Sequence, residues 1–105
     1  MAVMSVTVLR LKPGRYDDFL KFHTQVEELW AKAGAQNQRL IAAGAAGEAT
    51  GSIVATWEAE DYEKYGQVLH AFFNSGGAAD LGREGRGPDS PIADFQVSTY
   101  IDIPR

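Results

Sequence analysis

The chain has 105 residues, of which 45% are hydrophobic and 23% are charged, and its formal net charge is -4. A chain of this length can bury one core but not two, so we expect a single domain over residues 1–105. The acidic balance argues against binding to nucleic acid or to anionic membranes, because both require clustered Lys and Arg. The sequence contains no cysteine, which excludes disulfides, thiolate metal sites and a cysteine nucleophile.

The first eight residues, Met1 to Val8, carry no basic leader and are too short for the apolar core of a signal peptide or for a membrane span. The lack of cysteine is compatible with a reducing compartment. We therefore expect a cytoplasmic protein.

The first third of the chain predicts a strand followed by a helix. Val3 to Leu11 is rich in Val, Thr and Leu, as is typical of a strand with a buried face. Pro13 and Gly14 end this strand, and a helix that ends near Gly34 is indicated by apolar residues at spacings of three and four. These residues are Phe19, Phe22, Val26, Trp30 and Ala33.

The middle of the chain predicts a hairpin and a second helix. Two antiparallel strands, Asn37 to Ala43 and Ser52 to Trp57, are separated by the glycine-containing segment GAAGEATG. Asp61 is placed to cap the second helix. The expected inner stripe of this helix is strongly aromatic and consists of Tyr62, Tyr65, Val68, Leu69, Phe72 and Phe73.

The last third predicts a long loop and a final strand. Residues 74–91 are rich in Gly and Pro, so we expect a surface loop with at most one helical turn, around Ala78 to Leu81. The strand that follows alternates between an apolar and a mostly polar face. Its expected apolar face is formed by Phe95, Val97, Thr99, Ile101 and Ile103.

The order strand, helix, strand, strand, helix, strand is that of the split βαβ arrangement. The predicted fold class is therefore α+β, a ferredoxin-like βαββαβ fold with two helices on one face of a four-stranded antiparallel sheet. We expect the last strand to lie beside the first.

The segments VTVLRLKPGRYDDFLKFHTQ and IVATWEAEDYEKY resemble the dimeric α+β barrel superfamily, and within it the antibiotic-biosynthesis-monooxygenase-like and NIPSNAP-like small proteins. The similarity includes the Pro-Gly turn after the first strand and the pair Trp57 and Glu58 before the second helix. The resemblance implies a homodimer whose two sheets close face to face into a barrel. The superfamily includes cofactor-free monooxygenases, haem-degrading enzymes, isomerases and many proteins of unknown role, so the resemblance leaves the function open.

The sequence lacks most of the residues that would bind haem or a metal ion. The haem-degrading branch of the superfamily uses an Asn in the first strand and a Trp and a His in the second helix. This chain has Thr7 and Tyr65 at the corresponding positions, and His70 comes too early for the axial ligand. His23 and Glu27 are spaced as two metal ligands on one helix side would be, but no third ligand is identifiable. We expect neither a metal nor a cofactor.

His23 and Tyr65 are the candidate catalytic residues. His23 lies at the edge of the apolar stripe of the first helix, where its ring could point into a pocket and carry a proton. Alternatively, the ring could be exposed to solvent and have no role. The candidate ligand-binding residues are aromatic side chains that could line a cavity between helices and sheet, or could equally build the core. They are Phe22, Trp30, Trp57, Tyr62 and Phe72.

These observations indicate a protein that binds a small apolar or aromatic metabolite. If it is an enzyme, we expect a cofactor-free monooxygenase or isomerase in which His23 and Tyr65 position protons. The alternative is a non-catalytic ligand-binding or stress-related module.

We also expect association of two chains through the sheet face that the helices leave uncovered. If the helices cover Phe95, Val97 and Ile101, this uncovered face shows Gln96, Ser98 and Tyr100 on the last strand. On the first strand we expect it to show Ser5, Thr7 and Leu9.

Overall fold

The computed structural model describes residues 2–44 and 51–104 of the chain. Within these residues no helix is long and apolar enough to cross a membrane. The described part of the chain forms four strands and three helices. In chain order they are β1 (Val3–Leu11), α1 (Tyr16–Ala33), β2 (Gln36–Ala42), β3 (Ile53–Ala59), α2 (Tyr62–Phe73), α3 (Ala78–Arg86) and β4 (Ile92–Ile101).

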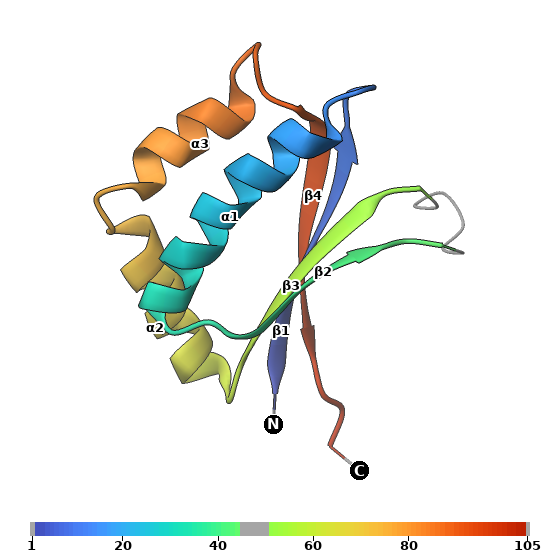
Figure 1. Ribbon diagram of the computed structural model, residues 1–105. Helices are drawn as coiled ribbons and strands as arrows, with labels where there is room; N and C mark the ends of the chain where they lie inside the picture. The colour runs from blue at the N-terminus through green and yellow to red at the C-terminus, as the bar shows by residue number, and fades with distance from the viewer. Residues whose placement is uncertain (1, 45–50, 105) are drawn as a thin grey trace.

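The strands form one antiparallel sheet in the order β2-β3-β1-β4, and the helices lie together on one side of it (Figure 1). The predicted ferredoxin-like α+β fold is confirmed, and the last strand pairs with the first as expected. The strands of the predicted hairpin are also present, with bounds shifted by one or two residues. Residues 45–50 of the intervening segment lie outside the described residues.

Each of the two predicted helices has the end that its sequence indicates. At the C-terminus of α1, Gly34 adopts φ 105°, and the amide of Ala35 donates a hydrogen bond of 3.0 Å to the carbonyl of Trp30. A left-handed glycine at this position satisfies carbonyls that the helix leaves unpaired. At the N-terminus of α2, the Asp61 carboxylate accepts a hydrogen bond of 2.8 Å from the amide of Lys64.

The third helix, α3, corrects the sequence prediction of a loop with at most one helical turn. Two of its apolar residues, Ala78 and Leu81, are buried, and this burial stabilises a segment whose glycine content disfavours a helix. Gly85 has a packing role, because a Cβ at this position would come within 3.0 Å of the Phe22 ring. Glycine therefore marks a close approach of α3 to α1 here.

The register of the sheet corrects the predicted faces of β1. Ser5, Thr7 and Leu9 pair with Thr99, Val97 and Phe95. Residues directly opposite each other in a sheet share a face, so the side chains of Ser5, Thr7 and Leu9 point toward the helices. Leu9 is accordingly 6% exposed.

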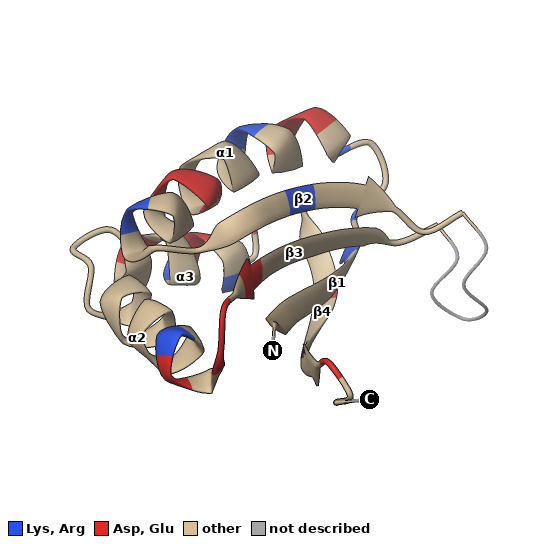
Figure 2. Ribbon diagram, turned by 90° about the horizontal axis from the view of Figure 1, so that it is seen from below, with Lys and Arg blue, Asp and Glu red and all other residues tan. Residues whose placement is uncertain are grey.

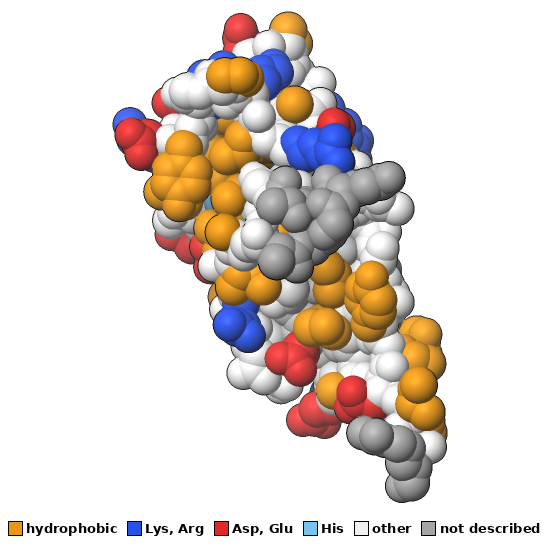
Figure 3. Space-filling model, turned by 90° about the vertical axis from the view of Figure 1, so that its right-hand side faces the viewer, with side chains coloured by type: hydrophobic (Ala, Val, Ile, Leu, Met, Phe, Trp, Pro, Cys, Tyr) orange, Lys and Arg blue, Asp and Glu red, His pale blue; other side chains and the backbone are white. Residues whose placement is uncertain are grey.

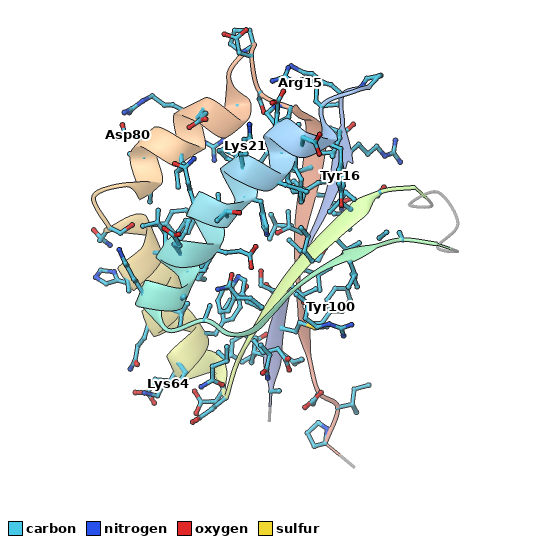
Figure 4. The ribbon with its side chains drawn as sticks, in the orientation of Figure 1. Arg15, Tyr16, Lys21, Lys64, Asp80 and Tyr100 are labelled. Atoms are coloured by element: carbon cyan, nitrogen blue, oxygen red, sulfur yellow. The ribbon has the colours of Figure 1, made fainter. Side chains whose placement is uncertain are left out.

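The opposite face of β1 carries Met4, Val6 and Val8, which are half-buried. The prediction for β1 was wrong because both faces of this strand carry apolar residues, and the face that the helices cover is the one that also carries Ser5 and Thr7. The polar face predicted for β4 does lie on the side away from the helices, as Tyr100 shows (Figure 4).

A compact core lies between α2 and the central strands. It consists of Val3, Trp57, Ala59, Tyr65 and Val68, with Trp30, Ala33 and Leu69 packed against it. Charged residues lie mainly on the helices and near the strand ends, and the strands themselves carry few (Figure 2). The inside of the molecule is therefore dominated by apolar and aromatic side chains.

Candidate functional site

A cavity of about 210 Å³ lies between the helices and the sheet. The backbone of α1 packs on α2 and α3 more closely than on any strand, which leaves space between α1 and the sheet. Residues from all four strands and from α1 and α2 line this space, which we call the inner cavity. Most of them are apolar or aromatic, and they include Leu9, Phe19, Phe22, Val26, Trp30, Trp57, Leu69, Phe73 and Val97.

Stacked aromatic rings form one wall of the inner cavity. The Trp30 ring stacks on that of Trp57 with a centroid distance of 4.8 Å, and Trp57 stacks on Tyr65 at 4.9 Å. Phe72 stacks on Trp30 at 3.6 Å. Rings stacked on one another in this way give the cavity a rigid apolar wall, which favours an apolar or aromatic ligand.

His23 is the titratable group best placed to act on such a ligand. Its side chain is 12% exposed, it lines the inner cavity, and its ring stacks on Phe19 with a centroid distance of 5.3 Å. Burial lowers the pKa of His23 below its ordinary value, and the carboxylate of Glu27 partly opposes this shift. The imidazole is therefore neutral at physiological pH and can accept a proton.

Glu27 is placed to stabilise the imidazolium that would result. One of its carboxylate oxygens lies 3.7 Å from Nε2 of His23. The side-chain amide of Gln38 donates a hydrogen bond of 3.0 Å to the backbone carbonyl of Glu27, which ties this part of α1 to β2. His23 and Glu27 thus form a general base and the carboxylate that supports it, on one side of α1.

The hydroxyl of Tyr65 forms a hydrogen bond of 2.8 Å with the hydroxyl of Thr99 on β4. This bond orients the phenol at the edge of the inner cavity, which Tyr65 also lines. Further polar side chains on the cavity wall are those of Ser5, Thr7 and Gln38. The site therefore combines an apolar body with a few polar groups, as small-molecule sites do.

The structure brings five of the seven candidate residues together at the inner cavity: Phe22, His23, Trp30, Trp57 and Tyr65. Tyr62 does not line this cavity; it is 55% exposed and meets Tyr65 edge to face. Phe72 lies behind Trp30, and the outer end of the predicted stripe, Phe73, is 67% exposed. The buried apolar stripe of α2 is narrower than the spacing of its aromatic residues indicated, because the rest of the molecule covers this helix on one side only.

Ser5 and Thr7 were missed as cavity residues, since the sequence analysis placed them on the uncovered face. The signal that could have found them is that they are two small polar residues on the same face of a strand that is mostly apolar. Polar side chains at such positions lie in a filled core only rarely.

A second, more open cavity of about 190 Å³ lies next to the inner one, under α3. We call it the outer cavity. The two cavities share five lining residues, Leu9, Phe22, Val26, Phe73 and Ile92. Those of the outer cavity alone are Phe72, Ala78, Leu81, Gly82, Gly85, Arg86 and Phe95.

Among the described residues, no group of three or more His, Asp or Glu side chains is arranged to hold a metal ion. His23 and Glu27 face each other as a pair, and His70, the other histidine, is exposed on α2.

No protein-family model matches the sequence, and no curated protein gives a significant match. Solved structures do resemble this one. An uncharacterized NIPSNAP domain protein from Burkholderia xenovorans superposes with a TM-score of 0.73 at 15% identity, over 98% of this chain and 95% of that one. SnoaB, a cofactor-independent oxygenase from Streptomyces nogalater, gives a TM-score of 0.69 at 12% identity, over 99% and 95% of the two chains.

An antibiotic-biosynthesis-monooxygenase-like protein from Bordetella bronchiseptica has a TM-score of 0.65 at 19% identity, over 97% of each chain. These are the two groups that the sequence resembles, so the predicted resemblance is confirmed at the level of fold. Identities this low carry the fold alone, and the function has to be argued from the site.

Proposed function

We propose that the chain binds a small aromatic metabolite in the inner cavity and that His23 acts there as a general base. The reaction would be a cofactor-free oxygenation or isomerisation of an acidic phenol or enol-type substrate. The observation that carries this proposal is a neutral, nearly buried imidazole in the wall of an aromatic cavity.

The size of the inner cavity supports a ligand of one or two rings. Its volume is about 210 Å³, whereas an engineered apolar cavity of about 150 Å³ in another protein binds benzene. The stacked side chains of Trp30, Trp57 and Tyr65 would form the apolar wall against which such rings pack.

The chemistry begins with removal of a proton from the substrate by His23. Glu27 stabilises the resulting imidazolium, and Tyr65, oriented by Thr99, lies where it can donate a hydrogen bond to a developing oxyanion. The apolar surroundings keep water away from the anion. In an isomerisation the proton returns from His23 to another carbon atom of the substrate.

In an oxygenation the substrate anion instead gives electrons to dioxygen. For a ring methylene the balance is CH₂ + O₂ → C=O + H₂O, so the substrate supplies all the electrons and no cofactor is consumed. The fold similarity to SnoaB, which is a cofactor-independent oxygenase, supports this version of the proposal.

Exchange of solvent deuterium into β-tetralone tests the base directly, because this two-ring ketone has acidic benzylic protons next to its carbonyl. We expect the protein to accelerate the exchange, followed by NMR, and His23→Gln to lose about 10²-fold or more of that acceleration. His70→Gln is the matched control, since His70 is exposed and lies away from the cavity. An oxygen electrode separates the two reactions, because only the oxygenation consumes dioxygen.

Equal acceleration by the wild type and by His23→Gln would contradict the proposed base. Binding of β-tetralone without any exchange would instead indicate the non-catalytic ligand-binding module. If β-tetralone does not bind and undergoes no accelerated exchange, the proposed function as a whole is contradicted.

We further propose that two chains associate through the sheet face that the helices leave uncovered. Its centre is apolar, with Val6 and Val8 on β1 next to Val54 on β3. Two large hydrophobic side chains of the same face are exposed, Ile41 at 40% and Tyr100 at 56%. Apolar side chains gather on this face (Figure 3), which is the pattern of a surface that a second sheet can cover.

A further inference from the structure

The inner and outer cavities share five lining residues, among them Phe22, and we treat them as the inner and outer lobes of one site. This ring lines both cavities, whereas His23 lines only the inner one and Arg86 only the outer one. Four further residues are shared, which shows that the two lobes lie side by side. A ligand that passes the Phe22 ring would therefore occupy both lobes.

Gly85 of α3 determines where the Phe22 ring lies. A Cβ on Gly85 would be 3.0 Å from Cζ of Phe22, which is tighter than ordinary van der Waals contact. Any other residue at this position would push the ring away from α3 and narrow the passage between the lobes. Phe22 is itself 9% exposed, so little free space surrounds it.

Arg86 gives the outer lobe its chemical character. It is the one charged residue among those described that line this lobe, and the others are apolar or glycine. The neighbouring Arg83 is paired with Asp80, whereas Arg86 makes no ion pair with any residue of the described ranges. A guanidinium at the rim of an apolar lobe can bind a carboxylate or phosphate with two parallel hydrogen bonds.

We propose that the ligand consists of an aromatic ring, an unbranched apolar arm and an anionic end group. The ring lies in the inner lobe beside His23, the arm passes Phe22, and the anion binds Arg86. Phe22, held in place by the absence of a side chain at Gly85, determines how thick the arm can be. This inference rests on the proposed function, because it takes the inner lobe as the place of the ring.

Calorimetry with a series of phenylalkanoates, from phenylpropionate to phenylhexanoate, tests the proposal. Each acid is compared with its uncharged amide, which has the same ring and arm. We expect the acid of the best length to bind about fivefold more tightly than its amide, as an exposed ion pair allows. The emission of Trp30 and Trp57, the two tryptophans of the chain, should change on binding because both line the inner lobe.

Arg86→Gln should remove the preference for the acid, while Arg83→Gln, in the same turn of α3 but outside both lobes, should keep it. Gly85→Ala should weaken binding of acids and amides relative to β-tetralone, which needs the inner lobe only. Gly66→Ala adds the same methyl group to α2, where it meets no atom within 4 Å, and should leave this ratio unchanged.

The proposed anion site is contradicted if Arg86→Gln keeps the preference for the acid, or if the wild type shows none. The proposed role of Phe22 is contradicted if Gly85→Ala binds the acid, its amide and β-tetralone with the same relative affinities as the wild type. In both cases exchange into β-tetralone that depends on His23 would leave the proposed function standing. If no probe binds, including β-tetralone, both proposals fail.

Discussion

The hydroxyl groups of Tyr65 and Thr99 lie 2.8 Å apart and tie helix α2 to the edge strand β4. Tyr65 is buried and stacks on Trp57 with a centroid distance of 4.9 Å, so the hydrogen bond fixes a ring that is already packed. Thr99 is exposed on a strand that pairs on one side only. The bond therefore helps to hold the helix layer against the part of the sheet that the helices cover least.

Tyr65→Phe should reduce the free energy of unfolding by about 1 kcal/mol, because it removes the hydrogen bond and keeps the ring. Thr99→Val should have an effect of similar size. The double variant should lose less than the sum of the two, with a coupling free energy of about 1 kcal/mol in denaturant titrations. Strictly additive losses would show that the two hydroxyls do not interact in solution.

His23 should make the protein less stable in mild acid. Burial lowers the pKa of His23 in the folded state below 6.5, the value that applies to the unfolded chain. As the pH falls through 6.5, the unfolded chain takes up the proton first, so the free energy of unfolding falls until the pH passes the pKa of the folded state. Above that window both states are neutral at this residue and the contribution is constant.

We therefore expect the wild type to lose more stability than His23→Gln between about pH 8 and about pH 5, whereas His70→Gln should follow the wild type. Thermal unfolding at several pH values measures the difference. An NMR titration of the imidazole gives the pKa itself, and Glu27→Gln should lower that pKa further, since the Glu27 carboxylate raises it. A higher pKa in Glu27→Gln would contradict the assigned interaction.

The sequence predicted those features of the fold that depend on residues close together in the chain, namely helix α1, its C-terminal end and the start of α2. The spacing of Phe19, Phe22, Val26 and Trp30 predicts α1, Gly34 predicts its end, and Asp61 predicts the start of α2. In each case the residues that form the feature are close together in the chain, so a single sequence contains the whole signal.

The features that depend on distant parts of the chain could not be predicted in this way. Both faces of β1 carry apolar side chains, so the face that meets the helices follows only from its pairing with Phe95 and Val97. α3 is stabilised by burial of Leu81 and by the contact of Gly85 with Phe22, although its composition favours a loop. Phe22 also lines both cavities, which no local pattern indicates.

Two glycines should respond in opposite ways to replacement by alanine. Gly34 has φ 105°, a backbone conformation that strains any residue with a Cβ, so Gly34→Ala should reduce the free energy of unfolding by about 1 kcal/mol or more. Gly66 lies inside α2, and a methyl group added there would meet open space. Gly66→Ala should therefore raise the free energy of unfolding by up to about 1 kcal/mol. Denaturant titrations measure both changes, and a stabilising Gly34→Ala would contradict the left-handed C-cap of α1.

The proposed dimer can be tested with two neighbouring residues of β1 that point to opposite faces. Val8 pairs with Val54 and Gln96 and lies on the uncovered face, whereas Leu9 is 6% exposed beneath the helices. A charge at Val8 would be buried at the centre of the proposed interface, where an unpaired carboxylate is strongly unfavourable. The same charge at Leu9 would be buried inside each chain.

We therefore expect Val8→Asp to give a folded monomer, with the circular dichroism of the wild type and half its mass in light scattering. Leu9→Asp should unfold the chain, because the helices cannot cover a charge at the wall of both cavities. Tyr100→Ser, at the edge of the uncovered face, should weaken the dimer without splitting it fully, since the residue is 56% exposed in the single chain. A wild-type protein that stays monomeric over a dilution series would contradict the dimer, and so would a Val8→Asp variant that keeps the dimer mass.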